Sequence, residues 1–159
     1  QRINDLNLNE NLLVTRPDLK ASQWIVNNTT TQARFLVNSF FAYDDTLIVG
    51  ADAGWWLPLL TGRQTTLPPL NYGSERGPRE DYRQWINSLT AEINQKGLDD
   101  PDVLSMLVER NVTHVYIGQR HGRVNNPSHP LEPSKLLANP HFTPIYHQDR
   151  VWIFQFNHP

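Results

Sequence analysis

Apolar residues recur at helical spacing in three segments of the chain. The first segment follows Arg16, Pro17 and Asp18, where proline suits the first helical turn and an early carboxylate complements the helix dipole. The second ends at Gly97, and the third begins after Asp99 and Asp100. The apolar positions that define these three predicted helices are Leu19, Ala21, Trp24 and Ile25; Tyr82, Trp85, Ile86, Leu89 and Ile93; and Val103, Leu104, Leu107 and Val108.

Short apolar runs between polar clusters predict strands and two further helices. The run at 112–118 emerges as a strand directly from the helix before it, and this step favours a parallel sheet. Between Gly54 and Gly62 the pattern predicts a short buried helix with a glycine C-cap, in which Pro58 fits only the first turn. The remaining predicted elements are central strands at 33–37 and 46–49, a brief strand at 63–67, a short helix at 134–138, and an antiparallel hairpin of 142–147 and 151–156.

These elements together predict an α/β fold. We expect a three-layer, Rossmann-like domain over residues 16–159, with a mostly parallel sheet and a C-terminal antiparallel hairpin. Residues 1–15 are rich in asparagine and fit neither a strand nor a helix, so we expect a connector there.

Composition narrows the classes of function. The chain has 159 residues, of which 38% are hydrophobic, enough for one continuous core. A formal net charge of -2 provides no positive field for a phosphate backbone, so we expect no nucleic-acid partner. No run approaches the roughly 20 apolar residues that span a bilayer. The absence of cysteine excludes disulfides and thiolate metal sites.

The segment from Gly50 to Trp56 carries the first candidate chemistry. Glycines after a strand let backbone amides approach a phosphate, but the spacing matches no known phosphate loop, and a tight turn explains it equally well. We expect several polar residues to lie on segments that leave the sheet at the same edge, and to form a sugar-binding pocket beside two tryptophans. The simpler interpretation is that Asp52 caps a helix and that Arg63 pairs with an acidic residue of a loop. The residues of this candidate pocket are Asp52, Trp55, Trp56, Arg63, Tyr72 and Glu75.

A second candidate is the basic loop around Arg120 and His121, which could meet a phosphate or carboxylate. The six histidines show no metal-ligand spacing, so we expect no metal and no cofactor. No serine stands in a nucleophile elbow, and the paired aspartates occupy turn and cap positions. We therefore expect no catalytic residue and no activity in this chain alone.

Several segments of the sequence resemble a known group of proteins. These segments are Trp24-Ile25 with Asn27-Asn28-Thr29, residues 33–37, residues 54–63, and residues 112–118. They resemble the soluble C-terminal region of polytopic bacterial membrane proteins of the GT-C glycosyltransferase type, relatives of the dolichyl-phosphate-mannose protein mannosyltransferases. In that group the catalytic acids lie in the membrane portion, so the resemblance implies a non-catalytic accessory domain.

The resemblance further implies a setting and partners. The domain would face the periplasm or cell exterior, joined through residues 1–15 to the last membrane segment of its parent chain. Its partners would be that membrane portion and a lipid-linked sugar or glycan, and it would support or gate substrate access. Two alternatives stay open: an independent module that binds a sugar or lipid-linked sugar, and a small stand-alone α/β enzyme that uses Asp52, Glu75 and His121.

Overall fold

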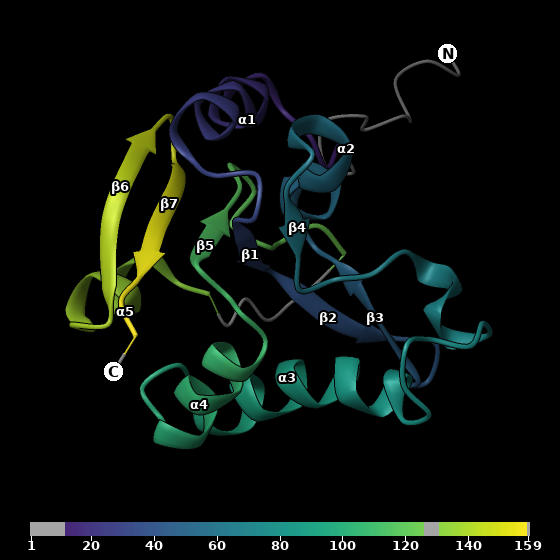
Figure 1. The fold of residues 1–159 in the computed structure, drawn as a ribbon. Coiled ribbons are helices and arrows are strands. Elements are labelled where there is room, and N and C mark those ends of the chain that lie inside the picture. The colour runs from purple at the N-terminus through teal and green to yellow at the C-terminus, as the bar shows by residue number, and fades with distance from the viewer. Residues whose placement is uncertain (1–11, 126–130, 159) are drawn as a thin grey trace, which may run out of the picture.

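The computed structural model describes residues 12–125 and 131–158, so most of the predicted connector lies outside the described residues. The fold is mixed α/β, with a five-stranded sheet, a separate pair of strands, and helices (Figure 1). Along the chain the elements are α1 (Arg16–Asn28), β1 (Arg34–Val37), β2 (Ser39–Ala42), β3 (Leu47–Gly50), the 3-10 helix η1 (Ala53–Trp56), α2 (Leu57–Thr61), β4 (Gln64–Thr65), the 3-10 helix η2 (Leu70–Gly73), α3 (Tyr82–Lys96), α4 (Pro101–Glu109), β5 (His114–Ile117), α5 (Pro133–Ala138), β6 (Phe142–Gln148) and β7 (Val151–Phe156).

The five-stranded sheet has the order β4-β1-β5-β7-β6. Strand β1 pairs parallel with β4 and β5, whereas β7 pairs antiparallel with β5 and β6. The sheet is therefore mixed rather than mostly parallel, because the whole C-terminal hairpin adds to the sheet through β7. The hairpin itself confirms the prediction from the sequence.

The strand expected at 46–49 exists, but it does not join the central sheet. It forms β3, which pairs antiparallel with β2 in the separate two-stranded sheet. The connecting turn contains three successive residues with positive φ, namely Tyr43, Asp44 and Asp45. This left-handed turn folds β3 back onto β2, a strand that the sequence analysis did not predict.

The predicted helices are confirmed, together with their end signals. Helix α1 begins with a capping box in which Thr15 and Asp18 bond each other's backbone. Helix α2 carries Pro58 in its first turn and ends at Gly62, whose φ of 67° is the left-handed conformation that favours glycine. Helix α3 ends before Gly97.

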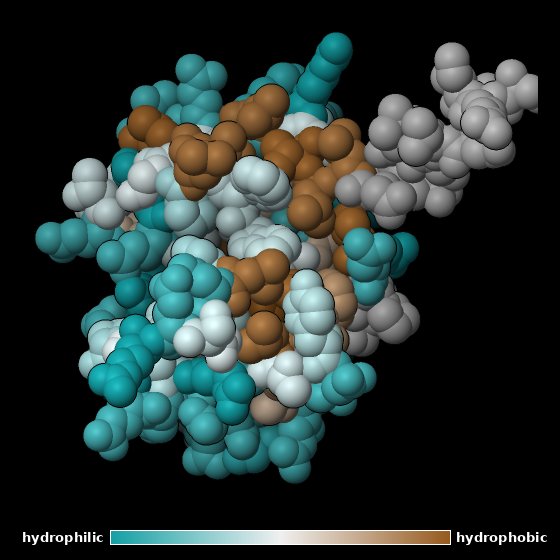
Figure 2. Space-filling view, turned by 90° about the vertical axis from the view of Figure 1, so that its right-hand side faces the viewer, coloured by the Kyte–Doolittle hydropathy of each residue, from teal (hydrophilic) through white to brown (hydrophobic). Residues whose placement is uncertain are grey.

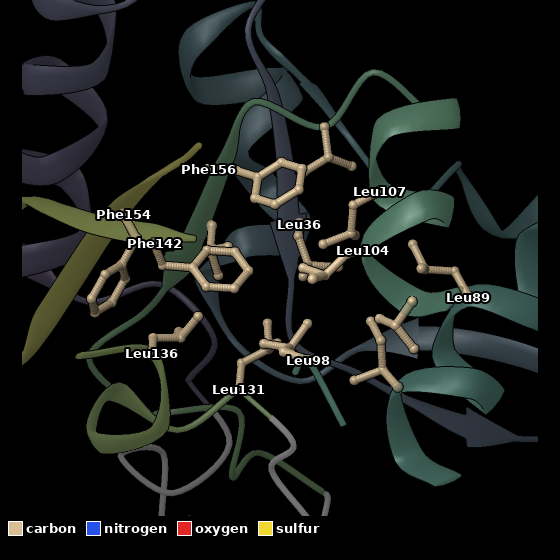
Figure 3. Close-up of a cluster of buried hydrophobic side chains, with 14 of the residues drawn as sticks. Leu36, Leu89, Leu98, Leu104, Leu107, Leu131, Leu136, Phe142, Phe154 and Phe156 are labelled. Carbon is tan, nitrogen blue, oxygen red and sulfur yellow. The ribbon is translucent and has the colours of Figure 1, made fainter. Parts of the chain in front are cut away.

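Alternate residues of the sheet supply two hydrophobic clusters on its opposite faces. Leu36, Val115 and Phe154 pack with the side chains of α3, α4 and α5, as Figure 3 shows for most of this cluster. Phe35 and Tyr116, which neighbour them along the strands, pack with α1 and α2. Figure 1 shows α1 and α2 on one side of the sheet and α3 and α4 on the other.

Candidate functional site

Two buried carboxylates lie at the carboxyl ends of the parallel strands β1 and β5. Asp18 and Asp52 are both 0% exposed. Asp52 caps η1 by accepting a hydrogen bond from the Gly54 N–H at 2.8 Å. Its other oxygen accepts from the Asn38 amide at 3.2 Å and from the Gly118 N–H at 3.1 Å. Asp52 therefore joins the segments that follow β1, β3 and β5.

Asp18 holds the same loop from the side of helix α1. One of its oxygens accepts from the Tyr116 hydroxyl at 2.7 Å and from the Gln119 N–H at 3.0 Å. Gly118 lies between the two acids, where an added Cβ would stand 3.1 Å from Asp18 Oδ1 and 3.2 Å from Asp52 Cβ. The loop after β5 therefore starts from a backbone position that has little room for a side chain.

Burial raises the pKa of the Asp52 carboxyl to about 6, because the charged form loses its hydration; Asp18 adds repulsion, and the three hydrogen bonds oppose the rise. Burial, with the charges of Asp18 and Asp52, also raises the pKa of Tyr116 well above its ordinary value, so its hydroxyl remains a donor. Asn38 Oδ1 is buried and meets no donor within the described residues.

The loop that these two acids hold lines a cavity of about 590 Å³, and most of the residues around this cavity are arginines. Its described lining consists of Gln119, Arg120, Arg123, Val124 and Arg150, and none of these is acidic. His121 ties this loop to the β6–β7 turn, because its Nε2 lies 2.7 Å from the Arg150 carbonyl oxygen. Arginines from two segments that are distant in the sequence, the loop after β5 and the β6–β7 turn, thus line the same cavity. We call it the arginine cavity.

Glycine is required at one point of this loop. Gly122 has a φ of 70°, and a Cβ there would lie 2.6 Å from Asn38 Cγ. The backbone therefore turns tightly over the side chain that follows β1. This close approach brings Arg120 and Arg123 to the carboxyl end of the sheet.

The structure places the predicted pocket residue Arg63 at the far end of α1 from Asp18. Its side chain donates to the carbonyl oxygens of Val26, Thr29 and Thr61 at distances of 2.9 to 3.1 Å. Arg63 is 8% exposed, and it serves the C-terminal end of α1 rather than a ligand.

Tyr72 and Glu75 also lie away from Asp52. The buried Tyr72 hydroxyl accepts from the Ile48 N–H at 2.7 Å and donates to Asn87 at 2.8 Å, so it joins β3 to α3. Glu75 lines a separate open cavity of about 740 Å³ formed by residues 72–80 and 82–84, where acids and arginines are mixed. The structure does not bring these two residues together with the arginine cavity.

The two tryptophans differ in their surroundings. Trp55 is half-buried against the cluster under α1 and α2, whereas Trp56 is 43% exposed. Leu59 on α2 is 75% exposed and Val26 on α1 is 45% exposed. Figure 2, which views the molecule from the right-hand side of Figure 1, shows hydrophobic side chains in its upper part and at its centre, whereas its lower part is mainly hydrophilic.

Sequence reasoning missed three residues of the carboxyl-end site. Asp18 has a sequence signal, the capping box, but that signal accounts only for its bonds to Thr15. Asn38 directly follows a buried strand, a position that often carries function in α/β sheets. Arg123 belongs to the basic loop that the sequence already indicated, whereas Arg150 gave no local signal, because only the paired hairpin brings it to that loop.

The described residues of this site place positive charge around the cavity. Across 12–125 and 131–158, no group of three histidine or carboxylate side chains is placed to hold a metal ion. The same described part of the chain contains no helix long and apolar enough to cross a bilayer. The two carboxylates are buried and hydrogen-bonded within the fold, whereas three arginines line the cavity, so the cavity suits an anion.

Comparisons with protein-family models, with curated proteins and with solved structures give no match to this chain.

Proposed function

We propose that this chain is a non-catalytic domain that binds a phosphate-bearing ligand in the arginine cavity. In keeping with its sequence resemblance, it acts as an extracytoplasmic accessory domain of a membrane-embedded, GT-C-like glycosyltransferase, and supports or gates access of a lipid-linked sugar. The observation that carries the proposal is a cavity of about 590 Å³ that three arginines line, with no acidic residue in the part of its lining that the structure describes. We also propose that the fold is a Rossmann-like, three-layer arrangement.

The shape and place of the cavity support a ligand of this kind. Guanidinium groups bind phosphate oxygens through paired, charge-assisted hydrogen bonds. The volume is typical of small-molecule sites. Open α/β sheets bind ligands beyond the carboxyl ends of their strands, and the loop after β5 lies there.

The positions of the candidate acids favour binding over catalysis. Asp52 is 0% exposed and engaged by three hydrogen bonds, and Glu75 lines a different cavity. The alternative of an enzyme using Asp52, Glu75 and His121 lacks a common point where a substrate could meet all three. A proton-transfer residue must come within hydrogen-bonding distance of the reacting group.

The exposed side chains of Val26, Trp56 and Leu59 support an accessory role. Apolar groups on α1, η1 and α2 remain in contact with solvent in the isolated chain. Contiguous exposed apolar surface often marks an interface. We assign this face to the contact with the membrane portion of the parent chain.

Calorimetric titration with farnesyl phosphate tests the binding function. We expect Arg123→Gln and Arg150→Gln each to weaken binding by about tenfold, because each removes a charge-assisted contact. Arg83→Gln is the matched control, since Arg83 is an exposed arginine on α3, away from the arginine cavity. Farnesol should not bind. Equal affinity for farnesol, or no effect of either cavity variant, would contradict the proposal.

Two further measurements separate the alternatives. A neutral disaccharide that binds while farnesyl phosphate does not would favour the independent sugar module. The reading frame upstream of Gln1 should encode multiple membrane spans, and a frame without them would overturn the accessory role while leaving phosphate binding intact.

A further inference from the structure

A second buried arginine, Arg110, lies at the opposite end of the parallel strands. It is the C-cap of α4 and is 4% exposed. Its guanidinium lies over the Trp85 ring, with 4.3 Å from Cζ to the ring centroid, and its Nη2 donates to Ser88 Oγ at 2.9 Å. Among the described side chains it forms no ion pair. A buried cation without a carboxylate is costly unless another anion accompanies it.

Two donors beside each other lack an acceptor. Within the described chain, the buried Nε of Arg110 and the buried indole Nε1 of Trp85 have no hydrogen-bond partner. Each such group costs about 1–3 kcal/mol when it is left unsatisfied. A single ligand with two acceptor oxygens would satisfy both.

A small cavity adjoins these donors. Its volume is about 90 Å³, and its lining includes Arg110, Trp85, Arg34, Thr65 and Thr66, with no acidic residue among the described ones. One water needs about 10–15 Å³ of such space, so the cavity has room for a small polyatomic ion but not for a sugar. Arg34 adds a second positive charge to the lining, although its guanidinium also bonds Gln64 Oε1.

The charge of Arg110 persists at neutral pH. Burial lowers the pKa of Arg110 to about 10; nearby Glu109 raises it, and Arg79 lowers it further. Arg79 lies over the Trp85 ring as well, at 5.4 Å, but it is paired with Asp81. The cavity therefore lies in a field that favours an anion.

We propose that this cavity binds a small oxyanion, the phosphate group of either free phosphate or a phosphate monoester, through Arg110 Nε, the Trp85 indole N–H and the charge of Arg34. The site is distinct from the arginine cavity, because Arg34 begins β1 whereas Asn38 follows its other end. The four residue steps from Arg34 to Asn38 along β1 span about 13 Å.

The test follows the indole N–H resonance of Trp85 by NMR while the whole chain is titrated with inorganic phosphate. The Trp85→Phe variant, which keeps an aromatic ring and removes the donor, assigns the resonance by its loss. We expect phosphate to shift this resonance and leave the other indoles in place. Arg110→Gln should weaken phosphate binding, measured by calorimetry, by about tenfold or more, and Trp85→Phe by about fivefold.

Controls separate this site from the first one. Arg150→Gln should leave the Trp85 shift and its midpoint within about twofold, since the removed charge lies in the arginine cavity. Circular dichroism confirms that each variant is folded; if Arg110→Gln is not, Trp85→Phe and Arg110→Lys still report on the donor geometry. Phenyl phosphate distinguishes the sources: binding of both ligands indicates a phosphate ester, and binding of inorganic phosphate alone indicates the free ion.

Two results would overturn the proposal. One is an unmoved Trp85 resonance at about 10 mM phosphate, a concentration that saturates sites of millimolar affinity. The other is equal phosphate affinity in the parent chain and in the folded Arg110 and Trp85 variants. Neither result would bear on farnesyl phosphate binding at Arg123 and Arg150.

Discussion

Replacement of Asp52 by asparagine should remove a defined part of the pH dependence of stability. The Asp52 carboxyl has an ordinary pKa of 3.8 and a pKa of about 6 when folded, mainly because burial penalises its charge. A carboxyl with a raised folded-state pKa binds a proton preferentially in the folded state. Its stabilising contribution is therefore complete below pH 3.8 and is lost as pH rises through 6.

The magnitude follows from the two pKa values. Between pH 7.5 and pH 4.5, protonation of Asp52 should raise the free energy of unfolding of the parent chain by about 2 kcal/mol, out of about 3 kcal/mol over the complete titration. Asp52→Asn does not titrate, so the difference in stability between parent and variant should change by about 2 kcal/mol over this interval.

Urea unfolding at the two pH values, followed by tryptophan fluorescence, measures this difference. The control is Glu80→Gln, which makes the same kind of change, carboxyl to amide, at an exposed position. The reasoning is refuted if Asp52→Asn shows the same pH dependence as the parent chain, because Asp52 would then titrate alike in the folded and unfolded states.

Two further substitutions test the architecture around the site. Arg63→Ala should destabilise the fold by about 2–4 kcal/mol, because three carbonyl oxygens at the ends of α1 and α2 lose their donor. Thermal unfolding measures this change. A loss of stability no greater than that of the control Arg83→Ala would show that Arg63 is dispensable. Gly118→Ala should cost about 1–3 kcal/mol, because the new Cβ would stand 3.1 Å from Asp18 Oδ1 and 3.2 Å from Asp52 Cγ; unchanged urea stability would mean that the two acids can move apart.

Local signals made the helices predictable. The apolar spacing of Ile86, Leu89 and Ile93 marks the buried face of α3, and Gly97 marks its end. Proline at the start of α1 and α4 carries similar information. These signals act within a few residues, so the sequence contains them directly.

Strand partners and site membership depend on distant segments. The pairing of β3 with β2 is an exception, because it is local: the reversal lies at Tyr43, Asp44 and Asp45, and the partner was missed because 39–42 was not predicted as a strand. Arginine is a residue type common in ligand sites, yet the Arg63 side chain donates to carbonyl oxygens at the end of α1. Arg120 and His121 were predicted as a basic loop, but their neighbour Arg150 arrives only through the hairpin turn.

The edges of the five-stranded sheet bear on self-association. One edge strand, β4, has two residues, and the other, β6, contains Pro144, which has no N–H to donate, next to a register shift between Pro144 and Tyr146. A strand from a second molecule would find a short ladder on one side and an interrupted ladder on the other. Chains at high concentration should therefore resist the edge-to-edge stacking that begins amyloid growth.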